Sequence, residues 1–185
     1  TTTNFAVDMS YTIHFENDSR LAFGMKAGGQ LLNIDYTKLN HYNPSDVSFR
    51  NNINSQFSPN IGAGLFYYTE NSYLGLSVPM LLQTKMYDEF AYSDANRRQH
   101  FYLTGGRVFD VTDNIKFKPA FIAKMVAGAP LQVDLTGNFL INEKFTVGVA
   151  YRWSAALSAL VGFKVNDRVS IGYGYDRETT RLSNF

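Results

Sequence analysis

The chain has 185 residues and a formal net charge of +1, and it contains no cysteine. A charge this close to neutral gives no basic field for a nucleic-acid partner, and the lack of cysteine excludes disulfides, thiolate catalysis and cysteine-based zinc sites. No apolar run approaches the roughly 18 residues that a transmembrane helix needs. Aromatic residues make up 15% of the chain, a high share that suits strands and membrane interfaces.

The first predicted element covers residues 5–15, where apolar and polar side chains alternate without a break. Val7, Met9 and Ile13 are among the residues of one parity, and Asp8 is among those of the other. A period of two places successive side chains on opposite faces of a β-strand, so this strand has one apolar and one polar face. It is also long enough to cross a bilayer at a tilt.

The same alternation recurs to the end of the chain, and we expect about ten strands in all. After the first, the expected strands cover residues 20–36, 60–69, 73–82, 99–109, 115–127, 131–141, 145–153, 156–165 and 169–176. Two long loops, residues 37–59 and 83–98, lie on the same side of the meander, and the connections on the opposite side are all short. Short turns at one rim and longer loops at the other are typical of outer-membrane β-barrels, whose short turns face the periplasm.

Two kinds of barrel fit this pattern, a transmembrane barrel and a soluble up-and-down barrel of the lipocalin kind. The expected strands are longer than the roughly five or six residues typical of soluble sheets, and their polar parity is rich in Gly, Ser and Thr. Aromatic residues near strand ends would form interfacial girdles; they are Phe5, Phe15, Tyr67, Tyr73, Phe101, Phe145, Tyr151, Trp153 and Tyr175. We therefore predict a single-domain transmembrane antiparallel up-and-down β-barrel over residues 1–185, with its apolar parity facing lipid.

Charged residues of the polar parity would then line the barrel interior. A hairpin centred on Ala129 would place Lys124 opposite Asp134, and one centred on Glu143 would place Asp134 opposite Arg152. This register predicts a basic–acidic–basic row across three strands. The row is either an ion ladder that keeps interior charges paired or part of a cationic wall that selects an anionic substrate segment. Further interior charges are expected at Lys116, Lys118 and Lys164.

Glycines and prolines within the strand patterns predict local irregularities. The pairs at residues 28–29 and 105–106 predict bends or bulges, which a barrel needs in order to close. Pro79 and Pro119 lack the N–H that a strand ladder uses, so we expect bulges or early strand ends at both.

Motifs for catalysis are missing from the sequence. It contains no Gly-x-Ser-x-Gly elbow, no phosphate-binding loop and no histidine spacing suited to a metal. We therefore expect no catalytic residues, no metal site, no cofactor and no enzymatic activity. The loop of residues 83–98 is a candidate protein-contact surface, with a plain solvated loop as the alternative; its aromatic residues are Tyr87, Phe90 and Tyr92.

Several stretches from residue 60 onward carry a family resemblance. They are residues 62–68, 73–79, 102–106, 116–119, 148–152 and 171–176, and above all Gly128-Ala129-Pro130-Leu131-Gln132-Val133-Asp134. In these stretches the sequence resembles the PorP/SprF family of type IX secretion system membrane proteins.

The resemblance implies an outer-membrane component of the type IX secretion and gliding machinery. It implies that secreted substrates, such as large cell-surface adhesins, are received or anchored through their C-terminal sorting domains. It also implies contacts with periplasmic motor or ring proteins at the short-turn rim. Because family members carry further strands, we expect this chain to be part of a larger barrel, incomplete at both ends. The alternative function is a diffusion channel or small-solute transporter, since a barrel of about ten or more strands is wider than side chains readily fill.

Overall fold

The computed structural model describes residues 1–34, 53–82 and 98–179. These residues include no helix that is long and apolar enough to cross a membrane. The described strands are β1 (Thr2–His14), β2 (Arg20–Ile34), β3 (Ile53–Tyr68), β4 (Ser72–Val78), β5 (His100–Arg107), β6 (Phe109–Thr112), β7 (Ile115–Val126), β8 (Gln132–Ile141), β9 (Phe145–Arg152), β10 (Ala156–Lys164) and β11 (Ser170–Glu178).

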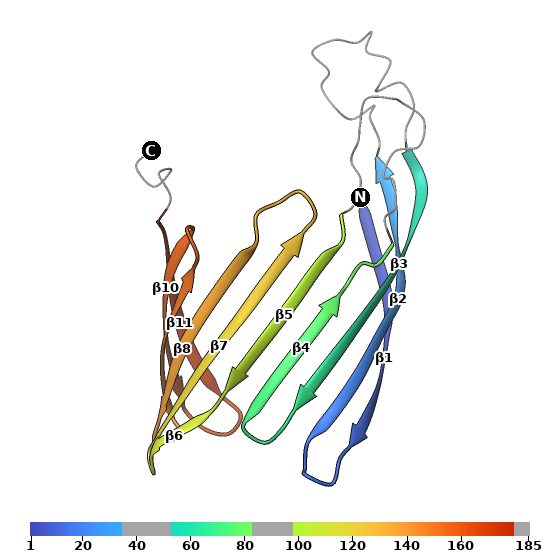
Figure 1. Cartoon of the computed structure of the whole chain (residues 1–185). Helices are drawn as coiled ribbons and strands as arrows, with labels where there is room; N and C mark the ends of the chain where they lie inside the picture. The colour runs from blue at the N-terminus through green and yellow to red at the C-terminus, as the bar shows by residue number, and fades with distance from the viewer. Residues whose placement is uncertain (35–52, 83–97, 180–185) are drawn as a thin grey trace.

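All of these strands belong to one antiparallel sheet. Its order runs from β1 to β5 and then from β7 to β11, so that neighbours in the sheet are neighbours in the chain, and the short β6 pairs with β7. The sheet curves like part of a barrel wall, with β1 and β11 at its two edges (Figure 1). It is open in this structure, because no ladder joins β1 to β11. The predicted all-β, up-and-down antiparallel architecture is confirmed.

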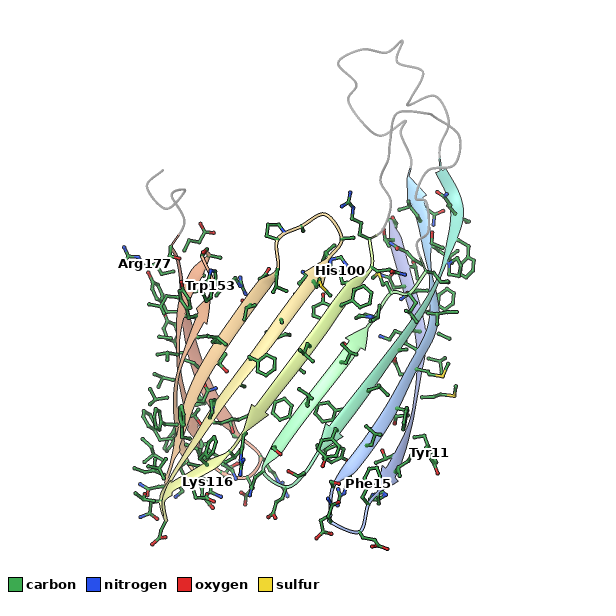
Figure 2. The ribbon with its side chains drawn as sticks, in the orientation of Figure 1. Tyr11, Phe15, His100, Lys116, Trp153 and Arg177 are labelled. Carbon is green, nitrogen blue, oxygen red and sulfur yellow. The ribbon has the colours of Figure 1, made fainter. Side chains whose placement is uncertain are left out.

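Alternation along the strands gives this sheet two chemically different faces. Cross-strand partners lie on the same face, so the register extends the alternation of β1 across every strand. We call the face of Val7 and its partners the apolar face, and the face of Asp8 and its partners the polar face. In Figure 2, Tyr11 of the apolar face projects outward from the right-hand side of the curved sheet. The apolar face is therefore the convex one.

The apolar face is highly exposed. Val7 and Met9 are each 67% exposed, and Ala156 is the one buried hydrophobic residue in the described part of the chain. A soluble barrel would instead gather Val7, Met9 and Ile13 into a core. An apolar surface that extends across a whole curved sheet suits contact with hydrocarbon, as in a membrane barrel.

The lower rim in Figure 1 carries the short turns. They join β1 to β2, β3 to β4, β6 to β7, β8 to β9 and β10 to β11. The turn of residues 142–144 has left-handed backbone at Asn142 and Glu143, with φ of 50° and 56°. It is centred on Glu143, as the sequence predicts. The connections at the opposite rim include residues 35–52 and 83–97, which lie outside the described residues.

The largest correction to the predicted strands concerns β3, which begins at Ile53 inside the segment predicted as a loop. The Asn, Ser and Pro residues of that segment are turn formers, which is why the sequence predicts a loop there. The long β2 provides a partner for it, with Leu31 opposite Phe57. The ring of Phe57 also stacks on Phe5, with 6.0 Å between ring centroids. Pairing and packing with neighbouring strands outweigh local turn preference here.

The two prolines within the predicted strands have different outcomes. β4 ends at Val78, directly before Pro79, so the predicted early end is confirmed. β7 continues through Pro119 in unbroken register with β8, so the prediction of a bulge or strand end in β7 is wrong. On its other edge β7 changes partner at Pro119. β5 pairs with β7 as far as Ala120, and β6 pairs with it at Phe117 and the residues before it.

The two glycine pairs produce no register shift, so the predicted bulges are absent. A Cβ on Gly28 would collide with the backbone of β1, and the other three glycines accommodate neighbouring side chains. A Cβ on Gly29 would collide with the ring of Phe57, and one on Gly106 would lie 2.9 Å from ring atoms of Tyr73. A second correction is β6, which occupies residues predicted mainly as a turn.

Candidate functional site

The polar face holds most of the charged residues of the strands. Its basic members are Arg20, Lys26, Lys116, Lys118, Lys124, Arg152 and Lys164, and its acidic members are Asp8, Asp110, Asp134, Asp176 and Glu178. Within the described residues, the strands carry two charges on the apolar face, Arg107 and Arg177, and both lie at or beside a strand end. Figure 2 shows Lys116 near the lower rim of the sheet and His100 near the upper one. The polar face is therefore the surface on which polar binding chemistry is available.

The best-defined ion pair joins β8 to β9. Arg152 Nε donates to Asp134 Oδ1 at 3.0 Å and lies 3.3 Å from Oδ2. The Asp134 side chain is 20% exposed and that of Arg152 is 45% exposed. The two residues are directly opposed, which confirms this half of the predicted charge row.

Lys124 does not continue the row, and the predicted register of its hairpin is wrong by two residues. Lys124 lies opposite Gln132, and Ile122 lies opposite Asp134. The cause is the turn, which Ala129 N–H closes by donating to Val126 C=O at 3.1 Å. Gly128, with φ of 80°, occupies the left-handed position of this turn, so the hairpin is centred one residue earlier than Ala129. A continuous basic–acidic–basic ladder is thereby excluded, although all three residues share the polar face.

The other predicted interior charges lie on the polar face in three different settings. Lys116 Nζ lies 3.8 Å from Asp110 of β6. Lys164 Nζ lies 2.8 Å from Asp167 in the following turn, and this hydrogen bond lowers the pKa of the Asp167 carboxyl. Lys118 pairs with no carboxylate among the described residues, and its Nζ lies 5.3 Å from the ring centroid of Tyr73.

A further polar-face ion pair, which the sequence analysis does not predict, joins β1 to β2. Lys26 Nζ lies 3.5 Å from Asp8 Oδ1, and the two residues are directly opposed on β1 and β2. The sequence contains the information for this pair, because a hairpin centred on Asn17 places Asp8 opposite Lys26.

Aromatic residues of the polar face were also missed. Tyr73 was predicted as part of a lipid-facing girdle, but it lies opposite Tyr68 and Gly106 on the polar face. Cations lie over three such tyrosines: Arg20 over Tyr68 at 5.7 Å, Lys118 over Tyr73 at 5.3 Å and Lys124 over Tyr102 at 5.9 Å. These are distances at which a cation is attracted to the face of an aromatic ring.

A hollow of about 620 Å³ lies at the short-turn end of the sheet, over β7 to β11. Its basic lining residues are Lys116, Lys144 and Lys164, with Glu143 as the acidic one. Leu140 and Leu160 add apolar surface. The hollow has the size of a small-ligand site, and two of its three lysines, Lys116 and Lys164, are already paired with carboxylates.

A second hollow, of about 360 Å³, lies over β1 to β4. Ser10, Gly24 and Gly64 are directly opposed in consecutive strands. Because these residues are small, they leave a depression in this part of the polar face.

One sequence prediction lies outside the described residues. The aromatic residues Tyr87, Phe90 and Tyr92 of the candidate contact loop lie outside the described residues. Within the described residues, no cluster of three or more His, Asp or Glu side chains is arranged to hold a metal ion.

The comparisons with known proteins concern the chain as a whole. A family model described as type IX secretion system membrane protein PorP/SprF matches residues 1–185. No curated protein and no solved structure shows a significant match.

Proposed function

Because the chain belongs to the PorP/SprF family of type IX secretion system membrane proteins, we propose that it is an outer-membrane component that receives secreted substrates on its polar face. The family match over residues 1–185 is the observation that carries this proposal. The two faces of the sheet support it, since the apolar face suits lipid and the polar face suits a polypeptide in transit.

The rim of short turns faces the periplasm in this proposal, as it does in other outer-membrane barrels. At that rim the hollow offers Lys144, which forms no ion pair among the described residues, together with apolar surface from Leu140 and Leu160 to periplasmic motor or ring proteins. The opposite rim then faces the outside, where substrates such as adhesins leave the machinery for the cell surface in gliding or adhesion.

Substrate reception through a C-terminal sorting domain is the finer part of the proposal. Basic residues outnumber acidic ones on the polar face. An excess of positive charge on an enclosed surface attracts anionic segments and orients them before close contact forms. The protein needs no chemistry of its own for this role, and we propose that it is not an enzyme.

A diffusion channel is the second candidate function. The observation that favours it is the depression in the polar face at Ser10, Gly24 and Gly64, which leaves room for solvent in a closed barrel. Conductance in planar bilayers tests it. A steady open-state current supports a channel, whereas a silent bilayer supports a receiver of substrates.

Gene deletion tests the proposed function directly. In a bacterium with type IX secretion that lacks this gene, we expect a cargo protein with a C-terminal sorting domain to accumulate in the periplasm. Restoring the gene returns the cargo to the medium or the cell surface, measured by immunoblots of the separated fractions. A cargo protein exported by another route is the control. Unchanged export of the type IX cargo in the deletion strain would refute the proposal.

A further inference from the structure

Near the lower rim, the polar face carries a strip of aromatic rings between two cations. Phe66, Tyr68 and Tyr73 form this aromatic strip, with ring centroids 5.5 Å apart between Phe66 and Tyr68 and 5.7 Å apart between Phe66 and Tyr73. Arg20 lies over Tyr68 at one end, and Lys118 lies over Tyr73 at the other. The strip and its cations span β2, β3, β4, β5 and β7.

Two of the three rings lie over glycines. A Cβ on Gly75 would lie 2.8 Å from a ring carbon of Phe66, and a Cβ on Gly106 would lie 2.9 Å from ring atoms of Tyr73. Arg20 and Lys118 lie over the two tyrosine rings, so Phe66 is the ring of the strip that carries no cation from the described residues. Phe66 is also the exposed ring of the three at 38%, whereas Tyr68 and Tyr73 are half-buried.

The cations of the strip also differ from most basic residues on this face. Lys26, Lys116, Arg152 and Lys164 each pair with a carboxylate. Arg20 and Lys118 pair with none in the part of the chain that the structure describes, and both side chains are exposed. Their charge is therefore available to a ligand, and the exposed ring of Phe66 between them supplies apolar area.

We propose that the aromatic strip binds an acidic segment of an exported polypeptide, in which two carboxylates flank aromatic or apolar side chains. This inference rests on the proposed function, because it requires substrates to contact the polar face. Four interstrand steps separate β2 from β7, a distance of about 19 Å. An extended peptide covers that distance in about six residues, which places both carboxylates and the side chains between them on one face.

A peptide titration on the full chain in detergent micelles tests the inference. The probe is the fluorescein-labelled peptide Asp-Ser-Phe-Ser-Phe-Ser-Asp, followed by fluorescence anisotropy. We expect it to bind more tightly than a peptide with lysines in place of the aspartates, and more tightly than one with alanines in place of the phenylalanines. Binding of the acidic peptide weakens as salt is added, because the contacts with the cations are exposed.

Substitutions on β7 provide a matched pair. Lys118→Gln removes a cation of the strip, and we expect an affinity loss of about five-fold, the effect of one exposed ion pair. Arg20→Gln has the same expected effect. Lys116→Gln is the control, because Lys116 lies two residues away on the same face but already pairs with Asp110; we expect a change of less than about two-fold. Phe66→Leu weakens binding while both cations stay in place.

Three results would overturn the inference. They are equal affinity for the acidic and the basic peptide, an equal loss from Lys116→Gln and Lys118→Gln, and full binding after Phe66→Leu. Any of them would mean that the rings serve only to cover their glycines. Circular dichroism confirms that each variant is folded. If cargo export still depends on the gene while the peptide fails to bind, the inference fails and the proposed function stands. If the peptide binds but the deletion does not affect export, the proposed function fails, and with it the assignment of an exported polypeptide as the ligand of the strip.

Discussion

The orientation of the two faces is tested by placing one charge on adjacent residues of β1. Met9 lies on the apolar face and is 67% exposed, so its replacement removes few protein contacts. Ser10 lies on the polar face and lines the hollow of about 360 Å³ over Gly24 and Gly64, which has room for a long side chain. The variants Met9→Arg and Ser10→Arg therefore differ mainly in whether the guanidinium meets lipid or the interior.

The expected cost follows from the position of Met9 in the strand. β1 has 13 residues, which at about 3.3 Å each give about 43 Å, or about 30 Å across the membrane at a tilt of about 45°. That value equals the thickness of the hydrocarbon core. Met9 is one residue from the strand centre at Asp8, or about 2 Å from the bilayer midplane. An arginine at that depth on the lipid face costs about 2–4 kcal/mol.

Urea unfolding in phospholipid vesicles measures the difference. Trp153 is the single tryptophan of the chain, and its exposed side chain reports unfolding by fluorescence. We expect Met9→Arg to lower the free energy of unfolding by about 2–4 kcal/mol and Ser10→Arg to change it by about 0.5 kcal/mol or less. Equal losses, or a larger loss from Ser10→Arg, would refute the assignment of the apolar face to lipid.

Three further predictions concern the polar face. Gly75→Ala should destabilise the protein by about 1–2 kcal/mol in the same urea assay, because the added Cβ forces the Phe66 ring off its neighbours. The control Gly174→Ala should be neutral or slightly stabilising, because the nearest atom to its added Cβ lies at 3.9 Å. Equal effects of the two substitutions would contradict the packing of Phe66 over Gly75. A double-mutant cycle of Asp134→Asn and Arg152→Gln should give a coupling energy of about 0.5–1 kcal/mol for this partly exposed pair, and additive losses would show that the pair does not contribute. A cycle of Asp134→Asn and Lys124→Gln should give no measurable coupling, and a coupling as large as that with Arg152 would support the register predicted from sequence.

Local features of the chain were readable from the sequence. Alternation with a period of two is a property of consecutive residues, so it revealed the strands and the division into two faces without knowledge of their partners. The pair of Asp134 and Arg152 was predictable for the same reason. A three-residue turn centred on Glu143 determines the register of the hairpin, and the turn is encoded in the residues that form it.

Features that depend on distant strands were not readable in this way. The start of β3 at Ile53 depends on the long β2 that pairs with it, and local composition predicts a loop there. Lys124 was misplaced because the left-handed position of its turn is Gly128, and the Gly-Ala-Pro sequence alone does not show which of two adjacent residues is the centre.

The sequence by itself determined that this is a two-faced antiparallel β-sheet protein, because side-chain alternation and tight turns depend on neighbouring residues alone. Only the tertiary structure decided which polar side chains meet. The aromatic strip of Phe66, Tyr68 and Tyr73 and the cations over its ends come from four strands, and their contact depends on the combined register of several hairpins. A shift of two residues in any one hairpin keeps every side chain on its face but changes its partner, so periodicity cannot reveal such a cluster.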